Sequence, residues 1–447
     1  MATTSVVGER WHVIGAGKSG VAAAELLARQ GAAEVVLLDE KPVESWGVRP
    51  THARVQTAHV DLRSLDTSSI ERCVVSPGVP PGPWSDALDA RGVAVWSEIE
   101  LAWRLRSGRE PVVAVGGTNG KSTTTSLIAH VLEVAGKRVF AGGNLGEPWA
   151  NHESERFDAA VIEVSSFQLE RVDTFKPRVS LLLNVTPDHL DRYPSFEHYA
   201  AAKGRAFERQ TADDLAVIPA GDAICRWQAV RGRGAIATFG VGGDVSVNGA
   251  RIVDAAAGVV VDLERTRLRG GHNALNVAAT LAALRPFFID AALVVDAIGS
   301  FEGLAHRTAL AGVVEGVRYY DDSKGTNVGA AVTALTGLLE AKAVLIAGGK
   351  DKGGSYEPLV EALRSKGRAV VTIGEAAPLI EAAVGDVVPV RRAATMEEAV
   401  RMAKGFAKSG DAVLLSPACA SFDMFKDYKH RGDVFVAAVH ALAEVSP

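Results

Sequence analysis

The segment VVAVGGTNGKSTTT, Val112 to Thr125, constrains the fold of this 447-residue chain more than any other. Its apolar run is typical of a buried strand, a glycine-rich turn follows, and Lys121 stands at the start of a helical pattern. This order brings backbone N–H groups, the positive end of a helix and a lysine together, as the phosphates of a nucleoside triphosphate require. A hydroxyl of Ser122 or Thr123 could serve Mg²⁺.

The spacing of this turn departs from the usual GxxxxGK[ST] pattern, because Val115 stands where the first glycine would be. An ordinary glycine turn is the simpler alternative. We favour a nucleotide site because the strand, the turn, the lysine and the hydroxyl fall in the expected order. The turn residues expected to bind ATP are Gly117, Thr118, Asn119, Gly120, Lys121, Ser122 and Thr123.

Properties of the whole chain limit its function further. A formal net charge of −5 argues against nucleic-acid binding, and three widely spaced cysteines suggest neither a disulfide framework nor a thiolate metal site. No stretch reaches about 18 uninterrupted apolar residues, so membrane insertion is not expected. We expect a cytoplasmic protein of roughly two to four domains, with nothing that demands more than a monomer.

The first part of the chain has the pattern of a second nucleotide-binding unit. Strand Trp11–Ile14 leads into GAGKSG, a helix is expected over Val21–Gln30, and a strand over Val35–Leu38 ends at Asp39. This is the dinucleotide fingerprint in its βαβ setting. It indicates a diphosphate attached to a ribose more firmly than a nicotinamide, and glycine turns that serve packing alone are the alternative.

Polar loops follow the strands expected in the middle of the chain. Asn144, Glu163 and His189 come after strands over Val139–Ala141, Ala159–Ile162 and Val179–Leu183. Alternating strands and helices predict a parallel sheet whose carboxyl ends meet at one edge, so these side chains should converge on the glycine turn. Glu163 and His189 would then lie where the γ-phosphate and its magnesium belong, although a lone histidine is more often structural.

A lysine occupies an unusual position in the helical run Phe196–Arg209. Lys203 shares the apolar face of Tyr199 and Phe207 at helical spacing. Burial would lower the pKa of its amine and leave a neutral nucleophile. Snorkelling of the amine to the surface is the alternative, which spacing alone favours.

Two further regions complete the chain. Leu215 to Leu268 has the pattern of an antiparallel extension of the middle unit, and a helix is expected over Asn276–Leu284. Asn273 or Asn276 would cap that helix or bind an adenine edge, and capping is favoured on local grounds. A third α/β unit is expected from its strands over Val317–Tyr320, Val344–Ala347, Ala369–Ile373 and Ala412–Leu415.

We therefore predict an α/β protein of three domains. Residues 1–99 would form an N-terminal Rossmann-like nucleotide-binding domain, and residues 100–306 a central P-loop ATPase-like domain. Residues 307–447 would form a C-terminal Rossmann-like domain. Its polar loops could face the other two domains and complete a cleft.

Eight motifs in register resemble the Mur ligases, the ATP-dependent amino-acid ligases of peptidoglycan synthesis. They are GGTNGKSTTT, GGNLG, EVSSFQLE, NVTPDHLDRY, GGHNALN, AHR, DDSKGTN and LLSPACASFDMFKDYKHRG. The first and last parts of the chain are most similar to the members that add D-glutamate to UDP-N-acetylmuramoyl-L-alanine. Asp321 and Gly325 replace an asparagine and an alanine common in the family, and neither change removes a side chain that the family mechanism needs.

The resemblance implies a reaction through an acyl phosphate made from ATP, with two Mg²⁺ ions that Mn²⁺ could replace. It implies that Lys121 binds the phosphates, that Ser122 and Glu163 serve one Mg²⁺ and that His189 serves a second. Lys203 matches a lysine that members carry as a carbamate metal ligand, and Lys324 should bridge toward the reacting groups. Asn273, Asn276, Arg307 and Asp322 should hold the rest of ATP.

The same resemblance implies the substrate-binding residues. Asn144 should contact the muramoyl-alanine group, while the UDP should lie among Lys18, Ser19, Asp39, Glu40, Lys41 and Gly78. The D-glutamate should be held by Thr326, Lys352, Ser421, Phe422 and Tyr428, with Lys350 as an alternative cation to Lys352.

Three other functions are weighed against this one. A nicotinamide dehydrogenase would explain only the first forty residues. A nucleotide-switch protein would explain the ATP site but neither Lys203 nor the third domain. Ligases of the same fold that add L-alanine, a diamino acid or a dipeptide, or folylpolyglutamate synthases, differ only in the first domain and the C-terminal loops.

Overall fold

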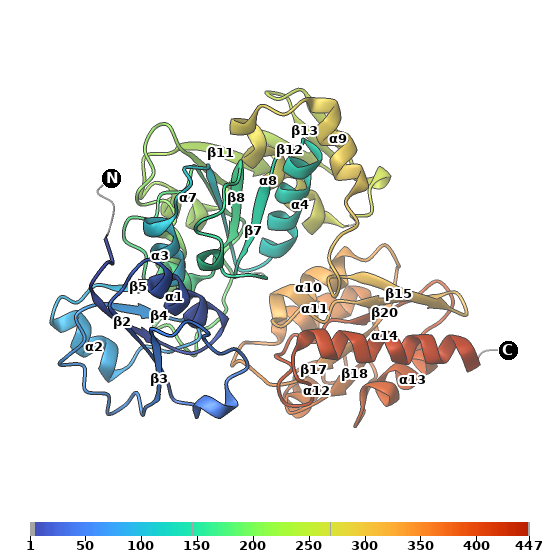
Figure 1. The fold of residues 1–447 in the computed structure, drawn as a ribbon. Helices are drawn as coiled ribbons and strands as arrows, with labels where there is room; N and C mark the ends of the chain where they lie inside the picture. Colours follow the sequence, from blue (N-terminus) through green and yellow to red (C-terminus); the bar gives the residue numbers. More distant parts are fainter. Residues whose placement is uncertain (1–4, 145, 269, 446–447) are drawn as a thin grey trace.

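The structure is a computed structural model that describes residues 5–144, 146–268 and 270–445. Leu145 of the GGNLG motif lies outside the described residues. Three β-sheets follow one another along the chain, and helices cover their faces (Figure 1). The α/β class and the parallel character of the sheets are confirmed.

The first sheet has five parallel strands in the order β3-β2-β1-β4-β5. The sequence analysis did not predict β3, β5 and the helix α2, because these elements are short or largely exposed. The elements of this part are β1 (Arg10–Ile14), α1 (Lys18–Arg29), β2 (Glu34–Asp39), η1 (Val43–Ser45), β3 (Val55–His59), β4 (Cys73–Val75), α2 (Pro83–Ala90), β5 (Val95–Ser97) and α3 (Glu98–Leu105).

The middle sheet has nine strands in the order β14-β13-β12-β11-β10-β9-β6-β8-β7, so β6 and its glycine turn lie inside the sheet. Its strands are β6 (Val112–Gly116), β7 (Val139–Gly143), β8 (Ala159–Glu163), β9 (Val179–Leu182), β10 (Leu215–Pro219), β11 (Ala235–Gly240), β12 (Val245–Asn248), β13 (Arg251–Asp254) and β14 (Val259–Asp262). Its helices are α4 (Lys121–Val134), α5 (Ser166–Leu169), α6 (Phe196–Gly204), α7 (Ala223–Ala229), α8 (Gly271–Leu284) and α9 (Ala291–Ser300), with short η2 (Trp149–Asn151), η3 (Leu263–Arg265) and η4 (Arg285–Phe287).

The expectation of an antiparallel extension over residues 215–268 is wrong for its first half. Strands β10 and β11 pair in parallel with each other, and β10 pairs in parallel with β9. Only the two pairs formed by β12, β13 and β14 are antiparallel among the described strands of this region. The short helix α7, capped by the Asp222 side chain, makes the crossover that a parallel pair needs.

The third sheet has six strands in the order β15-β16-β20-β17-β18-β19, parallel except for the edge strand β15. Its elements are β15 (Ala309–Val314), β16 (Val317–Asp321), α10 (Val328–Gly337), β17 (Ala343–Gly348), α11 (Glu357–Lys366), β18 (Gly367–Ile373), α12 (Ala377–Val384), β19 (Val390–Arg392), α13 (Met396–Phe406), β20 (Ala412–Leu415) and α14 (Tyr428–Val445). The edge strands β15 and β19, both largely uncovered, were missed by the sequence analysis.

Three local predictions need correction. Helix α8 begins at Gly271, so Asn273 and Asn276 lie within it; its N-cap is Gly270, and the favoured capping role is wrong. Helix α6 ends at Gly204, so Phe207 packs from the turn beyond it. The boundary expected between residues 99 and 100 falls inside α3.

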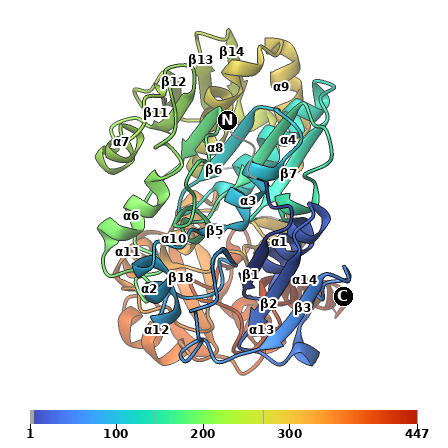
Figure 2. The same ribbon diagram turned by 60° about the vertical axis from the view of Figure 1, so that its left-hand side comes forward.

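One apolar core joins the first sheet to the middle sheet. Leu26 of α1 and Ile99 of α3 belong to the same buried cluster as Trp149, Ile162 and Phe175 of the middle part. The third sheet has separate clusters on its two faces. In both views the middle sheet lies above the other two (Figures 1 and 2), and Figure 1 shows the C-terminal part as a distinct lobe. No described helix is long and apolar enough to cross a membrane.

Glu100 of α3 ties the first part of the chain to the middle part. Its fully buried carboxylate accepts hydrogen bonds from the backbone N–H groups of Asp173, Thr174 and Phe175 at 2.9 to 3.0 Å. It also pairs with Arg104 at 2.5 Å. Because carboxylate oxygens only accept, both of them suit this ring of donors.

We expect Glu100→Gln to lower the free energy of unfolding by about 3 kcal/mol, because the new amide N–H₂ would face backbone donors in a buried site. Urea titration of the full chain would measure the change. Glu34→Gln is the matched control, since the Arg10–Glu34 pair is partly exposed and should contribute at most about 1 kcal/mol. Equal losses in the two variants would contradict this role for Glu100.

Candidate active site

The glycine turn after β6 is held by a side chain that follows β9, the strand next to β6 in the sheet. Asn184, just past β9, accepts hydrogen bonds from the backbone N–H groups of Thr118 at 3.2 Å and Asn119 at 2.9 Å. Its own amide donates to the Asn119 carbonyl at 3.1 Å. Gly120 takes a left-handed φ of +85°, and a Cβ there would lie 2.5 Å from the Asn276 amide oxygen. The turn therefore needs glycine for both conformation and space.

Lys121 and Lys203 both turn inward to the glycine turn. The Lys121 ammonium donates to the carbonyls of Gly117 at 2.9 Å and Thr118 at 2.8 Å. Lys203 is only 3% exposed, donates to the same Gly117 carbonyl at 2.8 Å and lies 4.5 Å from the centre of the Tyr199 ring. Burial, and then the charge of Lys121, hold the pKa of Lys203 well below its ordinary value. The snorkelling alternative for Lys203 is therefore wrong.

Glu163 connects three parts of the site. Its carboxylate, at the end of β8, accepts from the Ser122 hydroxyl at 2.5 Å and from the Asn144 amide at 2.6 Å. Arg307, from the C-terminal part, donates to the Ser122 hydroxyl at 2.5 Å. Ser122, Glu163 and Asn144 thus form one hydrogen-bonded group, as the convergence of the strand ends predicted, and Arg307 joins it from the C-terminal part.

His189 lies at the rim of this group. It has a positive φ of 55°, and its Nε2 is 3.7 Å from the Asp188 carboxylate. Its ring packs 4.8 Å from that of Phe167. Burial lowers the pKa of His189 and the Asp188 charge opposes that shift, so the burial favours the neutral ring that binds metals.

The C-terminal part supplies a second set of charges. Asp322 accepts from the Ser416 hydroxyl at 2.6 Å and from the Thr308 N–H at 3.1 Å, and burial raises the pKa of this carboxyl to about 7. The Lys324 ammonium lies 3.9 Å from the centre of the Tyr428 ring. Burial, and then the charge of Arg307, lower the pKa of Lys324 to about 8.

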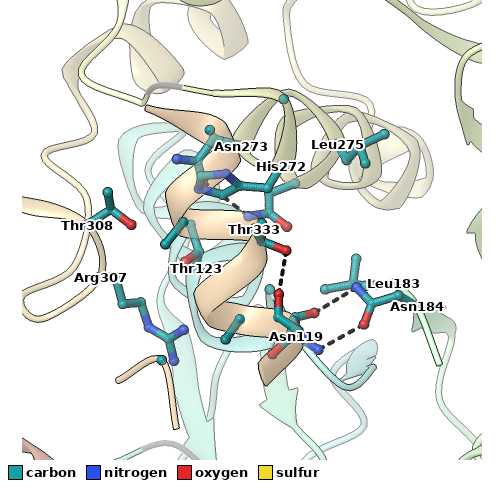
Figure 3. Close-up of a pocket in the computed structure, with 18 of the residues that line it drawn as sticks. Asn119, Thr123, Leu183, Asn184, His272, Asn273, Leu275, Arg307, Thr308 and Thr333 are labelled. Carbon is teal, nitrogen blue, oxygen red and sulfur yellow. Dashed lines mark hydrogen bonds between the residues drawn. The ribbon is translucent and has the colours of Figure 1, made fainter. Parts of the chain in front are cut away.

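A cavity of about 660 Å³ opens beside the glycine turn, between the middle and C-terminal parts (Figure 3). Eight predicted site residues line this one space: Asn119, Gly120, Thr123, Asn273, Asn276, Arg307, Asp322 and Lys324. Sequence reasoning missed other residues of its walls. His272 and Leu275 belong to the GGHNALN motif but were given no role, and the remainder have no motif that marks them: Pro219, Phe239, Leu268, Gly329, Ala330 and Thr333.

The candidate UDP residues lie at the carboxyl edge of the first sheet. Asp39 accepts from the backbone N–H groups of Ala16 at 2.6 Å and Lys41 at 2.8 Å, which fixes the first glycine turn. Arg192 links this edge to the middle part, because it donates to the Pro77 carbonyl at 2.9 Å and stacks on Phe167. The remaining candidates are exposed or half-buried on the same edge: Lys18, Ser19, Glu40 and Gly78.

The candidate D-glutamate residues are less closely grouped. Lys352 is half-buried and near enough for its charge to lower the pKa values of Lys121, His189 and Lys324. Lys350 is exposed and pairs through its backbone with Ala420. Of the others, Ser421 is buried, Thr326 and Tyr428 are half-buried, and Phe422 is 72% exposed.

Comparison with known proteins gives two family matches and close relatives. The Mur ligase middle domain matches residues 115–284, and the Mur ligase, glutamate ligase domain matches residues 306–419. The UDP-N-acetylmuramoylalanine–D-glutamate ligase of Geotalea daltonii is 40% identical, over 98% of each chain. That of Geobacter metallireducens is 41% identical, also over 98% of each chain.

The chain belongs to the Mur ligase family. It is therefore an ATP-dependent ligase. The MurF ligase of Thermotoga maritima, solved in complex with ADP, shares the fold with a TM-score of 0.61 at 18% identity, over 98% of this chain and 95% of that one. A pseudomurein peptide ligase type C from Methanothermus fervidus gives 0.60 at 17% identity, over 91% and 96%.

The oxygen ligands at the glycine turn of this Mur ligase suit a magnesium ion. Within residues 5–144, 146–268 and 270–445, no three His, Cys, Asp or Glu side chains come together as a complete metal site. Mg²⁺ commonly takes one or two protein oxygens and completes its shell with water and substrate phosphates. The hydroxyl of Ser122 and the carboxylate of Glu163, 2.5 Å apart, are oxygen donors of that kind beside a phosphate-type turn.

We expect kcat/KM for ATP to fall about tenfold per pH unit above about pH 8, because the cationic form proposed for Lys324, whose pKa is about 8, is lost there. A pH profile of phosphate release would measure this. In Lys324→Arg the guanidinium stays protonated, so the fall should move to higher pH. Because the variant keeps every other titrating group, an unchanged profile would rule out Lys324 as the group responsible.

Proposed function

We propose that this Mur ligase joins D-glutamate to UDP-N-acetylmuramoyl-L-alanine through an acyl phosphate made from ATP. The observation that carries the proposal is the meeting of Glu163 and Arg307 at the Ser122 hydroxyl, next to a glycine turn into which Lys121 points. The names of the relatives at about 40% identity over nearly the whole chain support the choice of substrates.

The proposed first step must bring two anions together, the substrate carboxylate and the γ-phosphate. Two unit charges 4 Å apart repel by about 4 kcal/mol at an effective dielectric constant of 20. Arg307 and Lys324 line the cavity and Lys121 lies at the adjoining glycine turn, so these residues supply fixed positive charge, to which the N–H groups of the turn add. Transfer of the phosphoryl group leaves ADP, and attack by the D-glutamate amine then releases phosphate as the amide forms.

In this proposal Ser122 and Glu163 hold one Mg²⁺ and His189 holds a second. The ions would neutralise phosphate charge. Lys203 is proposed to carry a carbamate, formed when its neutral amine adds CO₂ and loses a proton. Its near-complete burial and lowered pKa both favour the neutral amine that this reaction needs.

The three parts of the chain are proposed to divide the substrates. The edge of the first sheet around Asp39 would bind UDP, with Asn144 near the muramoyl-alanine group. The middle part would bind ATP. The C-terminal part would bind D-glutamate through Lys352, Tyr428 and the neighbouring candidates Thr326, Ser421 and Phe422. Action in the cytoplasm as a monomer stays a prediction.

Phosphate release from Mg-ATP would test this function directly. The assay contains UDP-N-acetylmuramoyl-L-alanine with D-glutamate, with L-glutamate or with no amino acid. We expect release that requires both the UDP sugar and the D-isomer. Release with another amino acid or another acceptor would instead assign the chain to a different ligase of this fold.

A further inference from the structure

Asn327 connects the C-terminal part to the glycine turn. It lies at the N-cap of α10, where its side-chain oxygen accepts a hydrogen bond from the Ala330 N–H at 2.8 Å. Its amide nitrogen points the other way, to the Asp188 carboxylate at 3.2 Å and the Asn119 side-chain oxygen at 3.4 Å. One side chain thus caps a helix and bridges to two loops of the middle part.

The bridge stands at the junction of the two walls of the cavity. Asn119 lies in one wall, and the first residues of α10 after Asn327, Gly329 and Ala330, lie in the other. Figure 3 shows Asn119 and Thr333 of α10 around the same space. Anything that moves α10 away from the glycine turn therefore widens the nucleotide site.

We propose that Asn327 is a positioning residue that holds α10 against the glycine turn and thereby sets the affinity for the nucleotide. The inference rests on the proposed function only in taking this cavity as the ATP site. Asn327 does not touch the reacting groups in this account. It acts through Asp188 and Asn119, because its amide N–H₂ donates the hydrogen bonds that hold α10 to these two residues.

The capping and bridging roles can be separated by one substitution. Aspartate caps helices as well as asparagine does, so Asn327→Asp keeps the bond to Ala330. It replaces the donor that faces Asp188 with a second carboxylate oxygen, which turns an attraction into a repulsion. We expect Asn327→Asp to weaken binding of ADP with Mg²⁺ by about tenfold, measured by titration calorimetry on the full chain.

A reciprocal exchange shows whether the contact itself is responsible. In a variant that already carries Asp188→Asn, the carboxylate introduced by Asn327→Asp lies opposite an amide. The pair then has one carboxylate and one amide, as in the natural chain, and the same net charge. There the second substitution should change ADP affinity by less than about threefold. Because the cycle compares the two backgrounds, any separate effect of Asp188 beside His189 cancels. Additive effects in the two backgrounds would overturn the proposal.

Controls separate a helix cap from a bridge. Thr395 caps α13 in the same lobe, and Thr395→Asp adds the same charge at a helix start without a cross-lobe contact. It should leave ADP affinity unchanged. If Asn327 served α10 only as a cap, Asn327→Asp would bind ADP like the natural chain, and the inference would fail. If the natural chain bound ADP but released no phosphate with D-glutamate, only the proposed substrates would fail.

Discussion

Replacement of Lys203 by alanine is expected to lower the rate of phosphate release at least about a hundredfold. The amine lies buried against the Gly117 carbonyl, and the proposed carbamate is the only form in which this side chain could bind a metal as an anion. Added formate or acetate should restore part of the rate to Lys203→Ala, because a small carboxylate can occupy the space that the side chain leaves. Steady-state rates across a carboxylate series would measure the rescue.

Two comparisons make the Lys203 result specific. Lys176→Ala removes a partly exposed lysine that pairs with Asp214, and it should neither slow the reaction nor respond to carboxylates. Thermal unfolding of Lys203→Ala shows whether the chain remains folded. Full activity of the folded variant without any carboxylate would refute the proposed role.

Replacement of Lys121 by methionine should reduce phosphate release by about a hundredfold to a thousandfold, because it removes a positive charge fixed at the glycine turn. Methionine keeps most of the apolar stem of the side chain, and the two hydrogen bonds that the ammonium donates to the Gly117 and Thr118 carbonyls are lost together with the charge. ATP binding should weaken as well, and calorimetry together with the phosphate assay would separate the two effects.

Lys137 offers a matched control for this variant. It follows the opposite end of α4, and a helix of 14 residues is about 21 Å long at 1.5 Å per residue. Lys137→Met therefore removes the same charge at a distance from the turn and should retain normal activity. Comparable losses in both variants would show that overall charge, and not the position of Lys121, governs the rate.

Those site residues that lie near the end of a single strand could be predicted from the sequence. Asn144 directly follows β7, Glu163 is the last residue of β8, and Ser122 lies in the first turn of the helix after β6. Parallel strands bring their ends to one edge. The contact of Arg307 with Ser122 could not be predicted in this way, since 185 residues separate the two in the chain. It depends on how two lobes meet, which no local pattern encodes.

The wrong predictions have a shared physical cause. Sequence patterns describe the helix or strand itself, whereas its ends are set by neighbours in space. Helix α8 extends back to Gly271 because its first turn lies against the glycine turn and α10, where Gly120 and Asn276 come close. The parallel pairing of β10 with β11 likewise depends on the crossover through α7. This helix is too short to give a clear helical periodicity in the sequence.

Because the first and middle sheets share one apolar core, the chain has two separately packed units although it has three sheets. One unit contains the first two sheets, and the other contains the third. A cut near residue 106 would leave the apolar faces of α1 and α3 and the matching face of the middle sheet without partners. A cut near residue 303 would separate lobes whose clusters are already closed. The C-terminal lobe is thus the part that could be exchanged between related ligases as a unit, together with the residues proposed to bind the amino acid.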